Sequence, residues 1–384
     1  MVNSELNICI ISPNYPPTDF RCGIGDYTQK FASEISKRGD RVTVLTSDRY
    51  QGASEVGGVK TIQFARKWGL LNGFRLLFLC MKCEFDIINV HHTPALYGFW
   101  FRVMLCIINI ITPVVVSFHT LHGATLKTKI ESVLLLMFCR GFISMNEEVT
   151  KILKNLWLTK RKEFTEIPIG SNVTPASDAI KDRIYAKSLF GIDADTLLIA
   201  NFGLFYPGRG LETLCEACRL LKKQTVNFVV FLLGAHREED KEYITKIVHM
   251  IDQMGFKKEI RLTGFLDENM VSQHLYASDI CVVPYDRGVS IRRTTLMAGL
   301  SHGLPTITTQ PETPSKYIKD GQNMILVPPR DPSALMKTIM DLWKNPEQRA
   351  KLGEQALTLS VLFNWPSISQ RTVDEYLRFL RRRK

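Results

Sequence analysis

Short apolar segments alternate with helical segments along most of the chain, in two successive series. The apolar segments lie at 7–12, 42–46, 86–90, 114–118 and 141–144 in the first series, and at 197–202, 228–233, 259–262, 280–283, 305–308 and 324–327 in the second. A short apolar run bounded by glycine or proline is typical of a buried parallel strand, and regular alternation with helices is typical of a doubly wound sheet. The sequence therefore predicts an α/β protein with two Rossmann-like domains.

The boundaries of the two domains follow from the place where this alternation stops. Near 167–193 the pattern gives way to polar, irregular sequence, and 384 residues exceed the size at which a single core usually stops growing. We expect an N-terminal domain over 1–170, a linker over 171–192 and a C-terminal domain over 193–362. The terminal segment, 363–384, is expected to form a helix that returns to the N-terminal domain.

The net charge of +11 restricts the classes of partner. Such a charge suits nucleic acid, an anionic lipid surface or a phosphorylated ligand. The sequence contains no nucleic-acid-binding module, and its basic residues are spread out except for the tail from Arg381 to Lys384, which argues against nucleic acid. The nine cysteines lack the dense layout of a disulfide scaffold, and the N-terminus does not read as a leader, so we expect a cytoplasmic protein.

Two basic loops of the second series each follow a strand and open a helix. Loop 203–212 contains Gly203, Gly208 and Arg209, and loop 286–295 contains Ser290, Arg292, Arg293 and Thr294. Backbone N–H groups at a helix N-terminus, the helix dipole and a fixed guanidinium can together bind a diphosphate. The first loop alone fits an ordinary glycine-rich turn equally well, and one of the paired arginines could instead pair with an acidic neighbour. Two such loops at the ligand-binding edge of one sheet favour a phosphate site.

The first series carries a different set of residues at the ends of its strands. Gly23, Gly25 and Asp26 follow the first strand, His91 and His92 follow another, and His119 follows a third. Because parallel strands share one carboxyl edge, we expect these residues to face a common cleft. His119 stands out because it directly ends an apolar strand, whereas His91 and His92 also fit polar caps. No carboxylate completes a metal-ligand set, and the glycine pair lacks the rest of a dinucleotide fingerprint.

Over nearly its whole length the chain resembles the retaining glycosyltransferases of family 4, also called glycosyltransferase group 1. The matching segments are Ile-Ser-Pro-x-Tyr-Pro-Pro at 11–17 with Gly23-Ile24-Gly25, Phe-His-Thr at 118–120, Ile-Pro-Ile-Gly-Ser-Asn at 167–172, Pro-Gly-Arg-Gly at 207–210, Ala-Ser-Asp at 277–279, His-Gly-Leu-Pro at 302–305 and Asp-Gly-Gln-Asn at 320–323. The resemblance implies a GT-B architecture, in which two Rossmann-like domains face each other across a cleft. It also implies a nucleotide-sugar donor on the C-terminal domain, an acceptor on the N-terminal domain, and retention of anomeric configuration without a metal ion or other cofactor.

The resemblance also assigns roles to individual residues. Arg209 takes the place of the family's phosphate-binding lysine, and His119 that of a histidine beside the transferred sugar. Gly23 and Gly25 match the loop that closes over the reacting sugar and phosphate, and we expect Gly25 and His119 to be catalytic. With Arg209, the donor-binding residues are expected to be Gly203, Gly208, Ser290, Arg292, Arg293 and Thr294. The acceptor-binding residues are expected to be Gly23, Asp26, His91 and His92.

The sequence departs from the family at three positions that matter for the donor. The usual pair of glutamates falls on Ser290 and Ala298, so neither carboxylate is present, and the arginine that usually precedes the phosphate-binding lysine falls on Leu204. We expect Arg292 and Arg293 to restore the missing positive charge, as in a Gly-Val-Ser-x-Arg-Arg subgroup. The base and sugar of the donor are left open, because the residues that would contact them are the ones that differ.

The acceptor is expected to be a glycan, a lipid-linked sugar or a small molecule. Segment 66–79 mixes basic residues with Trp68, Phe74 and leucines, which fits an interfacial helix at the inner face of a membrane and fits a core-facing helix with a basic edge at least equally well. Two alternatives remain for the function. One is a degenerate family member that binds a sugar nucleotide without turnover, motivated by the absent glutamates, and the other is a GT-B sugar-nucleotide epimerase, which the motifs favour less.

Overall fold

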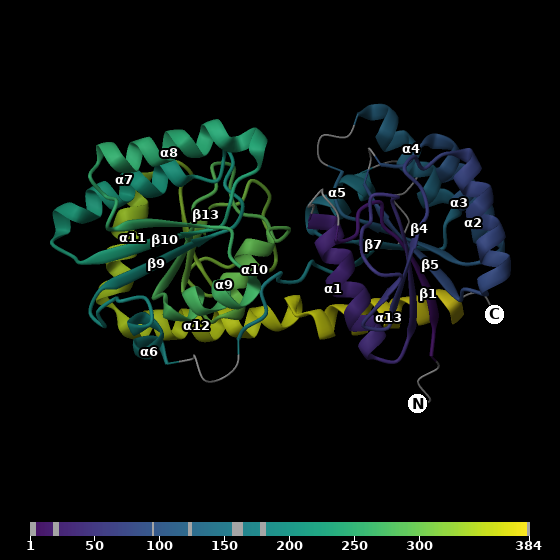
Figure 1. Cartoon of the computed structure of the whole chain (residues 1–384). Coiled ribbons are helices and arrows are strands. Elements are labelled where there is room, and N and C mark those ends of the chain that lie inside the picture. The colour runs from purple at the N-terminus through teal and green to yellow at the C-terminus, as the bar shows by residue number, and fades with distance from the viewer. Residues whose placement is uncertain are drawn as a thin grey trace. The chain divides into compact units, whose positions relative to one another are not determined.

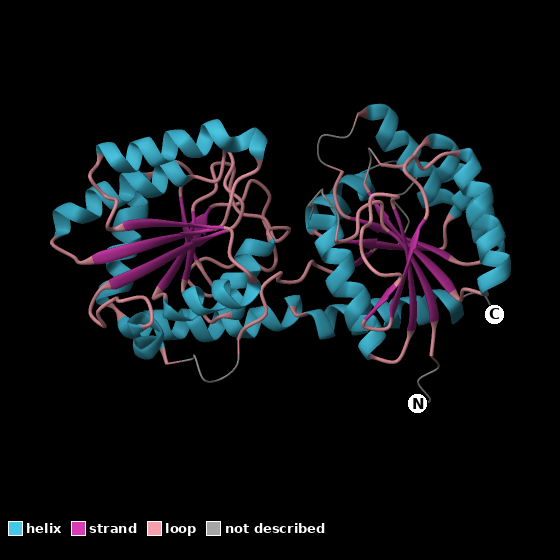
Figure 2. Ribbon diagram, in the orientation of Figure 1, coloured by secondary structure: helices cyan, strands magenta, loops and turns pink. Residues whose placement is uncertain are grey.

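The computed structural model describes residues 5–17, 23–93, 96–121, 125–155, 164–176 and 182–381, with the side chains of 126–129 and 134 left undescribed. The chain divides into two compact units. The N-terminal unit comprises Met1–Gly170 together with Asn364–Lys384, and the C-terminal unit comprises Ser171–Phe363. Each unit is a sheet covered by helices on its two faces (Figure 1, Figure 2). This is the pair of α/β domains that the sequence predicts.

The sheet of the N-terminal unit has the strand order β3-β4-β2-β1-β5-β6-β7-β8. The strands are β1 (Asn7–Ile11), β2 (Arg41–Thr46), β3 (Glu55–Val56), β4 (Val59–Gln63), β5 (Ile87–His92), β6 (Val114–Phe118), β7 (Gly141–Ser144) and β8 (Thr165–Glu166). All neighbours pair in parallel except β3 and β4, which pair antiparallel at the edge. The direction of strand order reverses between β1 and β5, so the loops after these strands meet at a topological switch point.

Two helical layers cover this sheet. Helices α1 (Gly23–Lys37) and α13 (Trp365–Arg381) pack together on one face, over Ile8 and Ile10 of β1. Helices α2 (Leu70–Cys83), α3 (Phe99–Ile111), α4 (Leu126–Phe138) and α5 (Glu147–Asn155) contribute to the core on the other face, over Cys9 and Ile11. The alternation of β1 side chains between the two cores is what a strand buried on both faces requires.

The sequence around residue 364 contains the signals that start helix α13. The Asn364 side chain accepts a hydrogen bond from the Ser367 backbone N–H at 2.8 Å, which caps the helix, and Pro366 stands in the first turn, where its missing N–H costs nothing. Farther along, Tyr376 is fully buried, and its hydroxyl accepts a hydrogen bond from the Asn89 side chain of β5 at 2.5 Å. The last helix of the chain is therefore an integral part of the N-terminal unit.

The sheet of the C-terminal unit has the order β11-β10-β9-β12-β13-β14, and all of its pairs are parallel. The strands are β9 (Leu197–Phe202), β10 (Phe228–Leu233), β11 (Ile260–Gly264), β12 (Ile280–Val283), β13 (Thr306–Thr309) and β14 (Ile325–Val327). Numbered from β9 as the first, they follow the strand order of dinucleotide-binding Rossmann domains. The switch point lies between β9 and β12.

Helices cover both faces of this second sheet as well. The helices are α6 (Arg183–Ser188), α7 (Leu211–Leu221), α8 (Lys241–Gln253), α9 (Glu268–Ala277), α10 (Thr294–Ser301), α11 (Pro332–Lys344) and α12 (Pro346–Ser360), with short 3-10 turns at Lys222–Gln224, Glu238–Asp240 and Val361–Phe363. One core joins α7, α8 and α11 to the sheet, and the other joins α6, α9, α10 and α12. The sequence predicts the six strands of this unit to within a residue or two at their ends.

Besides the strands β3, β4 and β8, which the sequence does not predict, the structure differs from the prediction in the linker and in segment 66–79. The described part of 171–192, expected to be a linker, belongs to the C-terminal unit. The reason is Lys187 of α6, which is 2% exposed, donates to the carbonyls of Ala194 and Thr196, and pairs with Asp279 at 2.8 Å. A buried charge is stable only with such partners, and these hold α6 against the sheet.

The second difference concerns segment 66–79, expected to form one amphipathic helix carrying Trp68. Helix α2 begins only at Leu70, and Trp68 precedes it as a buried residue that packs edge-on against Tyr97 and Phe101. Trp68 is thus part of the core and not of the surface.

Candidate functional site

The loops after β9 and β12 come together at the switch point of the C-terminal unit. Gly203 directly follows β9 with a φ of 135°, and a Cβ at this position would lie 2.5 Å from the Thr295 side chain and 2.8 Å from Nη2 of Arg209. Backbone N–H of Asp286, after β12, donates to the carbonyl of Gly208 at 3.1 Å. Glycine is required at 203 because the backbone there takes a positive φ and two side chains close over it.

Arg209 is buried under these loops and has only neutral hydrogen-bond partners. It is 2% exposed, and its Nη atoms donate to the hydroxyls of Tyr285 and Thr295 and to the carbonyl of Phe202, at 2.8, 3.3 and 2.5 Å. Among the described residues no carboxylate lies within ion-pair distance of Arg209, and its buried Nε has no hydrogen-bond partner. A guanidinium buried without an anion is costly, which indicates that an anionic ligand completes the site.

A second guanidinium shares the same aromatic ring. The central guanidinium carbons of Arg209 and Arg293 both lie 4.8 Å from the ring centre of Tyr285, which is itself buried. Arg293 also donates to the Tyr206 hydroxyl, and in the described part of the chain its buried Nε is without a partner. The face of an aromatic ring attracts a cation and holds it in place, but it does not neutralise the charge.

Two helix N-termini open at this site. Helix α7 begins after Gly210 and helix α10 begins after Arg293, and neither has a side-chain cap. The first-turn N–H groups of an uncapped helix carry partial positive charge and seek an acceptor. Two guanidiniums and two such helix ends therefore converge at one switch point.

The other donor residues predicted from the sequence lie in the same loops. Ser290 and Arg292 are partly exposed, and the carbonyl of Ser290 accepts from the Arg293 backbone N–H at 3.0 Å, immediately before Thr294 opens α10. Gly208 has a φ of 96° and open space where a Cβ would be. Sequence reasoning missed Tyr285 and Tyr206, which hold the two guanidiniums; the position of Tyr285 two residues after a buried strand was the available signal.

Among the described residues no carboxylate pairs with Arg209 or Arg293, so an acidic neighbour does not neutralise these two arginines. The acid of the second loop, Asp286, pairs with Arg330 at 3.3 Å. Its carboxylate is thus used by an arginine that comes from beyond β14, outside both loops.

The predicted residues of the N-terminal unit gather around Tyr27 of α1. His91 and His119 lie with their ring centres 5.4 and 4.9 Å from that of Tyr27 and 5.0 Å from each other. The Thr28 hydroxyl is 2.7 Å from Nδ1 of His91. Gly25 packs on the Asn14 backbone, where an added Cβ would lie 3.2 Å from the Asn14 carbonyl oxygen, whereas Gly23 is exposed with free space around it.

The three histidines differ in their access to solvent. His91 and His92 are fully buried in β5, and both ring nitrogens of His92 have no partner among the described residues. His119 is partly exposed as a residue, although its Nε2 is buried. Asp26, in the first turn of α1, is also partly exposed. Asp26 and His119 thus have some exposed surface, whereas His91 packs against Tyr27 and His119, and His92 packs against Tyr97 and Phe118.

Burial keeps these imidazoles neutral. It lowers the pKa of His119 to about 3 and that of His91 well below its usual range, and His119 nearby lowers that of His91 further. For His92 burial and the charge of Arg102 together lower the pKa to about 3. Burial also raises the pKa of Tyr27. Near neutral pH this cluster thus offers hydrogen-bonding groups without charge.

The low pKa values of these histidines predict a loss of stability in mild acid. An unfolded histidine binds a proton below about pH 6.5, whereas His92 in the folded unit stays neutral down to about pH 3. The free energy of unfolding of the N-terminal unit should therefore be greatest above pH 6.5 and fall as the pH drops, by roughly 1 kcal/mol per buried histidine per pH unit. Replacing His92 by phenylalanine, among Phe118 and Tyr97, should remove part of this fall.

Urea unfolding at two pH values measures the effect. The difference in midpoint between pH 7.5 and 5.5 is expected to be smaller for His92→Phe than for the unchanged chain. The matched control is His249→Gln on the exposed side of α8, which should leave the difference as it was. Equal pH dependence of His92→Phe and the unchanged protein would contradict the burial argument.

Two further observations bear on metals and membranes. Within the part of the chain that is described, no group of three or more His, Cys, Asp or Glu side chains is arranged to hold a metal ion. None of the described helices is both long and apolar enough to cross a membrane.

The switch point of the C-terminal unit is thus lined by the buried Arg209, by Arg293 and by two helix N-termini. Two Rossmann-like α/β units in one chain are typical of the GT-B fold. Comparison with known families agrees. The family model described as "Glycosyltransferase Family 4" matches residues 22–173, and the one described as "Glycosyl transferases group 1" matches residues 186–358. The chain is thus made of these two glycosyltransferase domains, which together cover most of both units.

Individual relatives are distant in sequence. The lipopolysaccharide core biosynthesis glycosyltransferase LpsE of Rhizobium meliloti (strain 1021) is 24% identical over 56% of this chain and 58% of its own length. The chain spans about half the length of the curated relatives it matches.

Solved structures resemble the chain over nearly its whole length. A glycosyltransferase from Rickettsia africae ESF-5 has a TM-score of 0.78 at 14% identity, covering 98% of this chain and 99% of that one. Anabaena Alr3699/HepE, solved in complex with UDP and glucose, has a TM-score of 0.73 at 15% identity, covering 97% and 99%. At such identities these likenesses establish the fold.

Proposed function

We propose that this protein transfers a sugar, with retention of anomeric configuration, from a nucleoside diphosphate sugar whose diphosphate lies at the switch point of the C-terminal unit. The observation that carries the proposal is the pair of guanidiniums, Arg209 and Arg293, on the ring of Tyr285 without a carboxylate partner among the described residues. A diphosphate supplies the negative charge that this arrangement lacks.

The proposed chemistry is electrostatic stabilisation of the leaving group. As the bond between sugar and diphosphate breaks, negative charge grows on the diphosphate oxygens. Donors that are already oriented toward that position stabilise the transition state without reorganising. The Arg209 guanidinium is held in one orientation, because it donates to Tyr285, Thr295 and the Phe202 carbonyl. We infer that these cations and helix ends supply the charge that transfer needs, without a metal ion.

In the N-terminal unit we place the acceptor-side groups at the loop after β1 and at His119. A neutral imidazole can exchange hydrogen bonds with sugar hydroxyls without adding charge. Gly25 keeps the start of α1 close to the Asn14 backbone. Its role in the proposal is to let the loop approach the reacting groups. A glycan, a lipid-linked sugar or a small molecule can serve as the acceptor.

The proposal of retention rests on the family likeness, and neither position at which the family carries a glutamate holds a carboxylate in this chain. The positions of the two family glutamates are Ser290, which is partly exposed, and Ala298, which is fully buried in α10. Neither side chain can act as a carboxylate nucleophile or base. We therefore propose that a phosphate oxygen of the donor takes the acceptor's proton on the face from which the diphosphate leaves.

A panel of ligands tests the donor site. UDP, GDP, ADP and their sugar conjugates are added to the protein, and the shift in melting temperature is measured, with the matching nucleosides as controls. We expect one diphosphate to stabilise the protein and its nucleoside to do so far less, because binding to the folded state alone raises its stability. No shift with any diphosphate would contradict the proposal.

Turnover with the stabilising donor then separates the transferase from its alternatives. Proton NMR of the product shows whether the new linkage keeps the donor's anomeric configuration, and an inverted product would exclude the proposed chemistry. Binding without release of nucleoside diphosphate, with any of a set of sugar and lipid-linked acceptors, would favour the non-catalytic alternative. That alternative is motivated by the residues at 290 and 298.

A further inference from the structure

Helix α3 of the N-terminal unit presents an apolar side chain at nearly every position, on its outer face as well as its inner one. Its one charged residue, Arg102, is buried and pairs with Glu131 of α4. The outer face consists of Phe99, Trp100, Ile107, Ile110 and Ile111, all of them exposed. A helix that is apolar all round is normally covered on every side, so this face calls for a covering partner.

The neighbouring helices extend this surface. Helix α2 packs beside α3 and exposes Leu71, Phe74, Phe78 and Met81; α4 packs on the other side of α3 and exposes Ile130, Met137 and Phe138 (Figure 1). We call these exposed residues of the three helices the apolar face. Phe78 is 66% exposed and Ile110 is 74% exposed, values that single surface residues reach but that a group on three adjacent helices rarely shares.

Positive charge borders the apolar face. Neither α2 nor α3 contains an aspartate or glutamate, whereas α2 carries Arg75 and Lys82, with Arg66 and Lys67 just before it. All four basic side chains are exposed, and Arg140 is exposed directly after α4. Long basic side chains at the edge of an apolar surface reach outward to phosphate groups while their methylenes stay on the apolar part.

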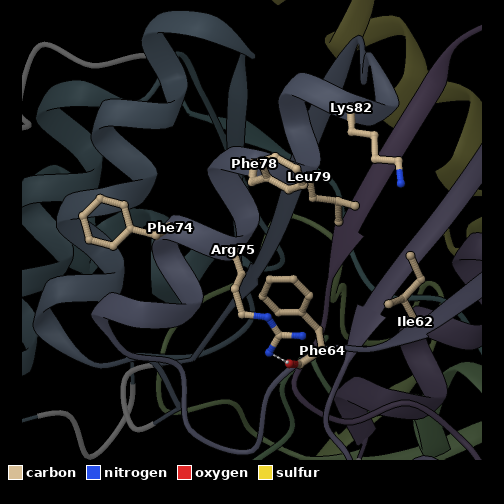
Figure 3. A pocket seen from close by; sticks show the side chains of 7 residues that line it. All are labelled: Ile62, Phe64, Phe74, Arg75, Phe78, Leu79 and Lys82. Carbon is tan, nitrogen blue, oxygen red and sulfur yellow. Dashed lines mark hydrogen bonds between the residues drawn. The ribbon is translucent and has the colours of Figure 1, made fainter.

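A groove between α2 and β4 also combines apolar side chains with basic ones. Its volume is about 500 Å³, and it is lined by Ile62, Phe64, Phe74, Arg75, Phe78, Leu79 and Lys82. Figure 3 shows Arg75 directed at the Phe64 carbonyl, to which it donates at 2.8 Å, with its guanidinium 4.9 Å from the centre of the Phe64 ring. The groove thus has an apolar lining with fixed positive charge beside it.

We propose that the apolar face of α2, α3 and α4 binds the surface of a membrane that contains anionic lipid. The apolar side chains enter the boundary between headgroups and acyl chains, and the basic residues contact lipid phosphates. Trp100 and the phenylalanines suit this boundary, where aromatic rings are enriched. The proposal concerns a surface of the N-terminal unit and stands independently of the donor site in the other unit.

The chemistry of the face favours lipid over a second protein. Protein interfaces carry roughly one hydrogen bond per 100–200 Å², but the single polar side chain on the outer part of α3, Asn109, is already used. Its amide donates to the Phe138 carbonyl, and its oxygen accepts from the Val114 N–H, both at 2.8 Å. A membrane surface does not need hydrogen bonds from the apolar part of a protein, but an anionic one favours positive charge at its edge. The apolar face, with its basic border, has this combination.

Vesicle flotation tests the proposal. The full chain is mixed with vesicles of phosphatidylcholine alone or with phosphatidylglycerol added. We expect the protein to float with the anionic vesicles and far less with the neutral ones. The double variant Phe78→Ser, Ile110→Ser should reduce the bound fraction by about tenfold or more, because two exposed apolar side chains no longer enter the membrane.

The C-terminal unit offers a matched control. Phe265 is 65% exposed and Val361 is 55% exposed, so Phe265→Ser, Val361→Ser makes the same kind of change on a surface of similar exposure. Lys67→Gln, Lys82→Gln should weaken the preference for anionic vesicles, whereas Lys223→Gln, Lys351→Gln, also exposed, should leave it unchanged. Correct folding of each variant is checked by circular dichroism and by its urea unfolding transition, which do not depend on nucleotide binding.

Three results would overturn the proposal. The unchanged chain could stay at the bottom of the gradient with both kinds of vesicle. The two serine double variants could lose binding equally, which would make it non-specific. Sedimentation in the absence of lipid could show a dimer that Phe78→Ser, Ile110→Ser turns into a monomer, which would assign the face to a second copy of the chain.

Discussion

Replacing Arg209 with methionine is expected to weaken the binding of the stabilising nucleoside diphosphate by about 10-fold to 100-fold, since a hydrogen bond to a charged group contributes roughly 1.5–3 kcal/mol. Arg209 is buried, and neutral groups hold it in one orientation. Methionine keeps much of the length of the side chain but carries no charge and no donor. The effect should fall on diphosphate affinity, measured by titration calorimetry, and much less on the affinity for the nucleoside.

A control for this variant lies on the same helix that follows the loop. Arg219 of α7 is exposed and pairs with Glu216 at 2.7 Å, so Arg219→Met removes a guanidinium of the same unit away from the switch point. Its diphosphate affinity should match that of the unchanged protein. Arg209→Lys should retain part of the affinity, because the charge remains while the planar fork is lost. Unchanged affinity in Arg209→Met, with the fold intact, would refute the placement of the diphosphate.

The fold could be predicted from the sequence because its strands are buried on both faces. Segments such as 197–202 and 228–233 are continuous apolar runs, and they are strands β9 and β10 as predicted. Strands β3, β4 and the two-residue β8 were not predicted. Segment 55–63 is partly exposed and mixes polar with apolar residues, so its pairing depends on the register with β2 and not on local pattern.

The arginines of the candidate site could be predicted from the sequence, but the residues that matter only through tertiary packing could not. Arg209 and Arg293 are visible in the sequence because a cation in a glycine-bearing loop after a strand points to a phosphate site. Tyr285 gives no such signal, because its importance arises only from the two guanidiniums that pack on it. Likewise, the sequence places His91 and His92 after a strand that ends at residue 90, whereas in the structure β5 continues through both residues and buries them fully.

Segment 66–79 shows that composition alone does not predict which apolar residues are buried. Trp68 and Phe74 are equally plausible surface residues by composition, yet the first lies in the core and the second is exposed. The difference follows from where α2 begins, at Leu70, with the preceding turn folded back so that the Trp68 carbonyl accepts the Gly98 N–H at 2.9 Å. A contact between residues thirty positions apart cannot be read from helical periodicity.

The second large effect is expected from Gly210→Ala, which should destabilise the C-terminal unit by about 3 kcal/mol or more. Gly210 has a φ of 75°, and a Cβ there would lie 1.8 Å from the Pro284 carbonyl oxygen. An L-residue in the left-handed region costs roughly 1–2 kcal/mol. The collision adds to this, because backbone must move and the overpacking of a tight contact typically costs about 1–3 kcal/mol. Calorimetry of the purified variant measures the change.

Gly210→Ala should also weaken the binding of the diphosphate. Pro284 precedes Tyr285, so pushing its carbonyl away from the first loop moves the ring on which Arg209 and Arg293 pack, and diphosphate affinity should fall with stability. Gly208→Ala is the matched comparison: its φ is 96°, but nothing lies within 4 Å of the added Cβ. It should show only the conformational cost and nearly normal affinity. If the two variants lost the same stability, the close approach of the β9 and β12 loops would not be what constrains the site.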